Sequence, residues 1–160
     1  MINNYANFTE AAMSENATSV HLRQQKDFQF EISFGEGIPT VLGDEPAPIG
    51  EGKGPSPAQF LAAAVGNCLA DSLFFAIKKY KQDPQPIQCK VTAEIGRNEQ
   101  GRLRITHMQA SLTLGVPAAS LQHMDRVLSS FEAFCTVTQS VGQGIPITIE
   151  VFDSENTRLK

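Results

Sequence analysis

The apolar and polar positions divide the chain into alternating stretches separated by two helical ones. Alternation over residues 18–34, interrupted by a Gln-Gln-Lys-Asp turn, predicts a β-hairpin. Residues 87–95 alternate without interruption and predict a half-buried strand. In residues 103–114 the phase switches near His107, which indicates a bulge or a twist in a long strand. A last alternating stretch, 145–151, predicts the final strand.

The most apolar stretch predicts a long helix with a well-defined start. Ser56 suits the N-cap, Pro57 suits the first helical position, and Gln59 completes a Ser-x-x-Gln capping box. The stretch from Phe60 to Ile77 is apolar nearly all round, so we expect it to be the central buried helix. Its small residues would let another element approach closely.

A second helix is predicted from Pro117, with apolar residues recurring on one face as far as Phe131. A short segment, Cys135 to Val141, then precedes the last strand and suits another helical turn. The resulting order, β-β-α-β-β-α-β, predicts the α+β class. The polar residues 1–17 are expected to form an N-terminal arm, either mobile or folded as a short helix, and residues 18–160 are expected to fold as a single domain.

The segment between hairpin and long helix, residues 35–56, contains six glycines and four prolines. A loop of this length inside a compact domain is either a functional loop or a solvated linker. The sequence leaves both interpretations open.

Composition excludes several classes of function. The chain has 160 residues, with 13 Lys and Arg against 17 Asp and Glu, so its net charge is −4. This balance argues against nucleic acid as a partner. No targeting segment is visible, and the apolar stretch contains Asn67 and Asp71, which favours a buried helix over a membrane span. Three cysteines without a CxxC pair suggest a reducing cytoplasm.

The cysteines are the candidate reactive groups. Cys68 lies too far along its helix for the dipole to activate it, and Asp71 nearby should raise its pKa, so it needs a cation from elsewhere. Cys135, at a helix start, is either an activated thiol or a core residue. Cys89 is expected to be buried and structural. The three histidines form no metal-binding pattern and no nucleotide-binding motif is present, so we expect neither metal nor cofactor.

Two segments resemble the cysteine motifs of one family. The run from Gly54 to Ala70 is similar to the first cysteine motif of the OsmC/Ohr (osmotically inducible protein C / organic hydroperoxide resistance) family. The run from Phe134 to Val141 is similar to its second motif. The resemblance extends over about residues 20–152.

The resemblance implies an α+β, OsmC-like fold: a central hydrophobic helix on antiparallel sheets, in an intertwined homodimer. It also implies a peroxidase in which Cys68 attacks the peroxide, Cys135 resolves the product into a disulfide, and a dithiol reduces it. Arg23 is the arginine expected to hold the thiolate, and Arg104 on the later strand is the fallback. Two positions depart from the family pattern, since Ala58 replaces a glutamate and Thr136 a proline. The chain therefore resembles a divergent OsmC-like branch.

Two functions follow from this resemblance. The first is a thiol-dependent reductase of organic or hydrogen peroxides. The alternative is a non-enzymatic protein that binds a hydrophobic or electrophilic small molecule in the dimer cleft. In both cases we expect a cytoplasmic homodimer without nucleic-acid or membrane partners.

Overall fold

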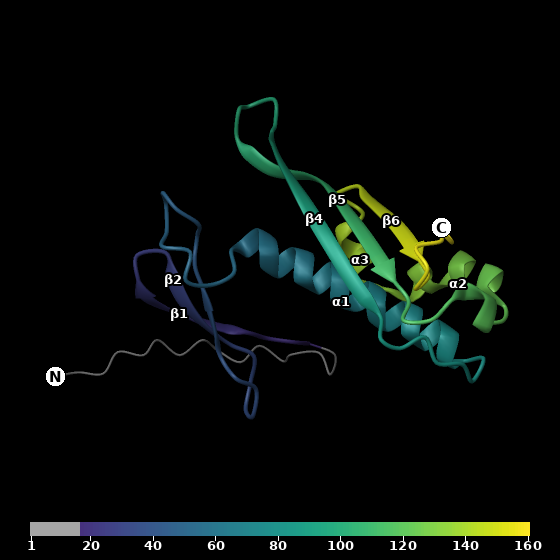
Figure 1. The fold of residues 1–160 in the computed structure, drawn as a ribbon. Helices are drawn as coiled ribbons and strands as arrows, with labels where there is room; N and C mark the ends of the chain where they lie inside the picture. Colours follow the sequence, from purple (N-terminus) through teal and green to yellow (C-terminus); the bar gives the residue numbers. More distant parts are fainter. Residues whose placement is uncertain (1–16) are drawn as a thin grey trace. The chain divides into compact units, whose positions relative to one another are not determined.

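The computed structural model describes residues 17–160, which divide into two compact units, residues 17–54 and 55–160 (Figure 1). The predicted arm, 1–17, lies almost wholly outside the described residues, and the single domain over 18–160 stays a prediction. The first unit is a three-stranded antiparallel sheet in the order β1-β2-β3. Its strands are β1 (His21–Lys26), β2 (Gln29–Ser33) and β3 (Val41–Gly43).

The predicted hairpin is present, but its turn lies later than expected. Strand β1 continues through the Gln-Gln-Lys segment, and the chain reverses at Asp27, which adopts a positive φ of 48°. Aspartate tolerates this left-handed conformation better than most residues. A bulge between Gln24 and Lys26 adjusts the register of the pair.

The glycine- and proline-rich segment contains a strand, β3, that the sequence did not predict. After β3 the loop is organised around the carboxylate of Asp44, which is almost fully buried. This carboxylate accepts hydrogen bonds from the backbone N–H groups of Glu45, Glu51 and Lys53, at 2.8, 3.2 and 3.0 Å. These donors hold the pKa of Asp44 below its usual range, the largest contribution coming from Lys53. The segment is therefore an ordered loop built on one acidic side chain.

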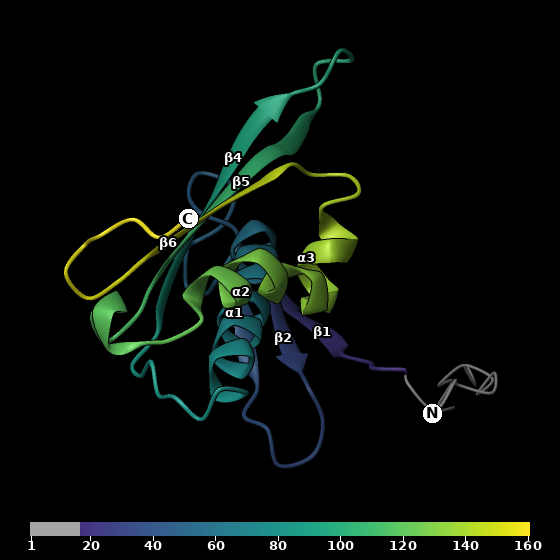
Figure 2. The ribbon, with the colours of Figure 1, turned by 90° about the vertical axis from the view of Figure 1, so that its right-hand side faces the viewer.

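The second unit packs a long helix, α1, between a three-stranded sheet and a set of short helices (Figures 1 and 2). The sheet has the order β4-β5-β6. Its α+β arrangement confirms the predicted fold class. The elements are α1 (Pro57–Lys78), β4 (Gln88–Arg97), β5 (Leu103–Thr113), η1 (Ala118–Ser120), α2 (Met124–Ser130), η2 (Phe131–Phe134), α3 (Thr136–Val141) and β6 (Ile147–Phe152).

The predicted start of α1 is confirmed, including both halves of its capping box. Ser56 Oγ accepts from the Gln59 N–H at 3.4 Å, and Gln59 Oε1 accepts from the Ser56 N–H at 2.9 Å. The expected burial is only partly present. The best apolar window of α1 has a mean hydropathy of 1.8, enough by length and composition for a membrane span, and a third of it is buried in the described structure.

The predicted bulge in β5 is confirmed. Glu94 of β4 pairs with His107, whereas the next residue, Ile95, pairs with Ile105, so Thr106 is the extra residue on β5. Beyond the bulge the inward face of β5 is fully buried against α1. The buried β5 residues are Met108, Ala110 and Leu112, followed by Leu114.

Two further expectations are corrected by the second unit. The predicted second helix is interrupted, because His123 has a positive φ of 61° and separates η1 from α2. The sheet is not wholly antiparallel, since β5 and β6 pair in parallel. The connection between them runs through α2, η2 and α3, and such a crossover returns the chain to the same end of the sheet.

Candidate functional site

The structure brings two of the three predicted site residues together. Cys68 lies in the middle of α1, half-buried, and Cys135 lies at the N-cap position of α3, fully buried. The two thiols lie close enough for Cys135 to affect the pKa of Cys68, although about 67 residues separate them in the chain. This proximity follows from the packing of α1 against η2 and α3.

Burial raises the pKa of the Cys68 thiol, and the neighbouring Cys135 raises it further. The backbone N–H groups of Val137 and Thr138, at the start of α3, act in the opposite direction by donating to the Cys68 sulfur. The net direction is upward, as the sequence predicted, but for a different reason. The largest causes are burial and Cys135 rather than Asp71, whose carboxylate accepts a hydrogen bond from Asn67 at 3.1 Å.

Thr138 is a residue of this site that sequence reasoning missed. Its side chain is buried, and its Oγ1 accepts a hydrogen bond from the Cys135 thiol at 2.9 Å. The available signal was the spacing, because a side chain three residues after a helix N-cap lies next to the capping residue. Cys135 is thus held by Thr138 and lies beside the Cys68 thiol.

The third predicted site residue, Arg23, belongs to the first unit. It lies on β1, where its side chain is 77% exposed and its guanidinium pairs with Glu31 across the β1–β2 ladder at 3.4 Å. In the second unit, the fallback Arg104 donates to the Leu103 carbonyl. The role of an arginine toward Cys68 stays a prediction.

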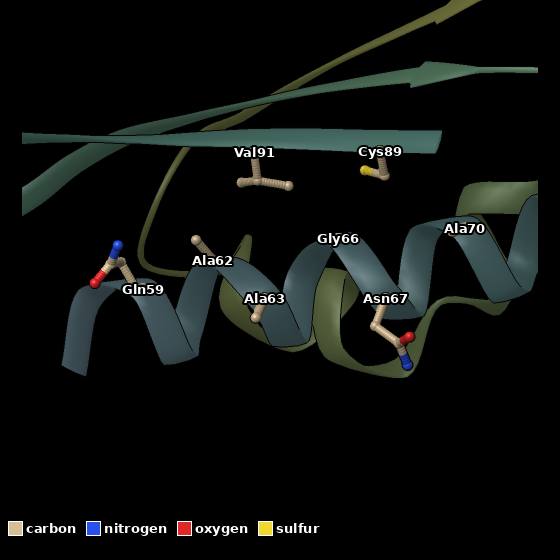
Figure 3. A pocket seen from close by; sticks show the side chains of 8 residues that line it. All are labelled: Gln59, Ala62, Ala63, Gly66, Asn67, Ala70, Cys89 and Val91. Carbon is tan, nitrogen blue, oxygen red and sulfur yellow. The ribbon is translucent and has the colours of Figure 1, made fainter. Parts of the chain in front are cut away.

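An open groove of about 400 Å³ lies on the other side of α1, between this helix and β4 (Figure 3). Gly66 and Cys68 are two residues apart, so their positions project from nearly opposite sides of the helix. The groove is mostly walled by small or apolar side chains. Its lining residues are Gln59, Ala62, Ala63, Gly66, Asn67, Ala70, Cys89 and Val91.

The close approach of β4 to α1 depends on Gly66. A Cβ at this position would lie 2.9 Å from Val91 Cγ2 and 3.4 Å from Cys89 Sγ. The predicted close packing at the small residues of α1 is therefore confirmed at this position. Cys89 lies beside it and lines the groove, half-buried rather than enclosed as expected, and burial raises the pKa of its thiol.

The histidines take separate positions in the structure. His107 shares a 2.8 Å hydrogen bond with Thr148, His123 stacks on Tyr80, and His21 is exposed on β1. Across residues 17–160, no three His, Cys, Asp or Glu side chains gather in a way that could hold a metal ion.

Comparison with known proteins identifies relatives of this architecture. The family model described as OsmC-like protein matches residues 50–150. No curated protein sequence matches the chain.

Solved structures share the fold at low identity. An OsmC-like protein of unknown function from Vibrio cholerae is 14% identical, with a TM-score of 0.71 over 85% of this chain and 99% of its own. The organic hydroperoxide resistance protein OhrB of Bacillus subtilis is 14% identical, with a TM-score of 0.66 over 84% of this chain and 97% of its own. An organic hydroperoxide resistance protein from Elizabethkingia anophelis is 13% identical, with a TM-score of 0.69 over 88% of this chain and 99% of its own.

Proposed function

Because the chain belongs to the OsmC-like protein family, we propose that it is a thiol-dependent peroxidase that reduces organic or hydrogen peroxides with Cys68 and Cys135. The observation that carries this proposal is the proximity of the two thiols at the α1–α3 junction. Similarity to structures of organic hydroperoxide resistance proteins supports the same reaction class.

The reaction has three balanced steps. The Cys68 thiolate attacks one peroxide oxygen, the O–O bond breaks, and the departing alkoxide takes a proton, which leaves an alcohol and a Cys68 sulfenic acid. The Cys135 thiolate then attacks the Cys68 sulfur, the S–S bond forms, and the displaced hydroxide leaves as water. An external dithiol reduces the disulfide and is itself oxidised by two electrons.

The environment of Cys68 predicts a slow first step. A raised pKa leaves little thiolate at neutral pH, and the thiolate is the nucleophile. We propose that Arg23 supplies the missing positive charge. Ala58, in the first turn of α1, lacks the carboxylate that would orient such an arginine, so Ala58→Glu should accelerate the reaction and Arg23→Ala should slow it.

The test is consumption of an organic hydroperoxide in the presence of a dithiol. We expect turnover by the wild type, none by Cys68→Ser, and unchanged turnover by Cys89→Ser, the matched control. With Cys135→Ser, the sulfenic acid should accumulate and be trapped by a sulfenate-specific reagent. Equal turnover in wild type and Cys68→Ser would refute the proposal.

We propose a homodimer in the cytoplasm as the working form. The exposed apolar residues of α1 support it, because Ala63, Ala64 and Phe75 are uncovered in the single chain and Phe75 is 57% exposed. Light scattering at micromolar concentration should give twice the chain mass. A monomer under these conditions would contradict this part of the proposal.

The groove favours a second candidate function, binding of a hydrophobic or electrophilic small molecule. Its volume lies in the range of small-molecule sites, and the half-buried Cys89 is the thiol that faces it. Under this alternative, Cys68→Ser would bind the ligand as the wild type does, and the wild type would not consume peroxide.

A further inference from the structure

The position of Cys135 depends on the short segment η2, which joins α2 to α3. The Cys135 N–H donates to the carbonyl of Glu132 at 3.0 Å, and the Gln139 side chain donates to the same carbonyl at 3.1 Å. The Glu132 carbonyl therefore fixes the backbone at the start of α3.

The side chain of Glu132 is held by Lys160. The Lys160 ammonium lies 2.6 Å from Glu132 Oε1, donates to the Leu128 carbonyl at 3.2 Å, and sits 5.6 Å from the centre of the Phe131 ring. The carboxylate contact is an ion pair rather than an aligned hydrogen bond, as suits the compact charge of lysine. The two side chains are 36% and 29% exposed, so water screens the pair less than an open surface pair.

Lys160 is in turn attached to the sheet. Its N–H donates to the carbonyl of Val151 at 3.3 Å, and the N–H of Leu159 donates to the same carbonyl at 2.7 Å. Val151 is fully buried in β6. Lys160 thus connects the edge strand β6 to the segment that carries Cys135.

From this chain of contacts we infer that the Lys160–Glu132 ion pair is a positioning device that holds the Cys135 sulfur opposite Cys68. This inference rests on the proposed function, and it concerns the second step, in which Cys135 displaces hydroxide from the sulfenic acid. When the pair is broken, η2 is free to move and the disulfide closes more slowly. A second peroxide then has time to convert the sulfenic acid to sulfinic acid, releasing a second alcohol.

The experiment measures the equilibrium between dithiol and disulfide in glutathione buffers, where oxidised glutathione accepts the two electrons. It uses the full chain with Cys89→Ser and quantifies the disulfide by alkylation and mass spectrometry. Lys160→Met should lower the effective concentration of the thiol pair about tenfold, since charge-assisted contacts are lost. Glu132→Gln should also lower this effective concentration, whereas Lys160→Arg, which keeps the positive charge, should retain most of the wild-type value.

The matched control is Glu150→Gln, which breaks the 3.1 Å ion pair between Arg158 and Glu150 in the same part of the second unit and leaves the hydrogen bond from Arg158 to the Lys160 carbonyl in place. If breaking either ion pair simply loosened the fold, the control and Lys160→Met would shift the thiol–disulfide equilibrium equally. We therefore expect the control to keep the wild-type equilibrium, and in peroxide-treated samples only the Lys160 and Glu132 variants should gain sulfinic acid at Cys68.

The two proposals fail separately. Equal thiol–disulfide equilibria in Lys160→Met, Glu132→Gln and Glu150→Gln would overturn the positioning role. A shift in the first two variants, with no peroxide consumed by any protein, would uphold the positioning role and overturn the peroxidase.

Discussion

The contact between Gly66 and β4 gives a stability prediction whose sign depends on one neighbouring side chain. In a helix, alanine is more favourable than glycine by about 1 kcal/mol, so Gly66→Ala would stabilise α1 if space were available. The added methyl would lie 2.9 Å from Val91 Cγ2, and valine has little freedom to rotate away. Overpacking of this kind costs about 1–3 kcal/mol. The net expectation is destabilisation by about 1 kcal/mol.

Removing the obstructing methyl should reverse the sign. In a Val91→Ala background, Cys89 Sγ at 3.4 Å is the remaining close neighbour, so Gly66→Ala should recover most of the helix-propensity gain. The coupling between the two substitutions should then be about 2 kcal/mol.

The assay is urea unfolding followed by far-UV circular dichroism at one fixed protein concentration, because an oligomer's stability depends on concentration. If Gly66→Ala stabilises the wild type as much as the Val91→Ala variant, β4 does not approach α1 as closely as described. The groove would then be wider and its lining different.

Three further predictions follow from the thiols and the Asp44 loop. The rate of Cys68 alkylation by iodoacetamide should rise about tenfold per pH unit through neutral pH without a plateau. Cys135→Ala should increase this rate, because it removes a neighbour that raises the Cys68 pKa. A plateau at a pH below the ordinary thiol pKa would contradict both expectations. Cys89→Ala should cost about 1 kcal/mol in urea unfolding, because the side chain is half-buried at a groove; loss of thiol chemistry in that variant would contradict its structural role. The Asp44 carboxylate stabilises the fold above its unfolded-state pKa, and this stability is lost as the pH falls through its lower folded-state pKa. Asp44→Asn should therefore remove this loss of stability at acidic pH and make the loop ending at Lys53 more sensitive to limited proteolysis. Unchanged cleavage would show that the carboxylate does not order the loop.

Features set by local interactions could be predicted from the sequence. The capping box of Ser56 and Gln59 needs only a four-residue pattern, and the bulge at Thr106 shows as a change of phase within one strand. The short strand β3 left no such signal, because its partner β2 supplies the ladder and three residues make no alternation. The break at His123 was missed for a similar reason, since apolar spacing continues across a residue whose backbone leaves the helix.

Less of the candidate site than of the fold could be predicted from local sequence patterns. Nothing local to Cys68 or Cys135 indicates that they meet; only the resemblance to a family paired them. The N–H groups that face Cys68 come from α3, and the contact with α3 is made by tertiary packing, so their effect on the Cys68 pKa required the structure. The distance between Arg23 and Cys68 is likewise not a property of any short segment.

The separation of the two neighbouring cysteines along the chain has a thermodynamic consequence. A bond between Cys68 and Cys135 would close a loop of about 67 residues that includes β4, β5 and α2. Cross-linking a loop of that length restricts the unfolded chain by an amount worth about 4 kcal/mol of stability. The native packing already holds both sulfurs close together, so little of this gain is spent on rearrangement. The oxidised chain would then be the more heat-resistant form, and exposure to an oxidant would strengthen the fold.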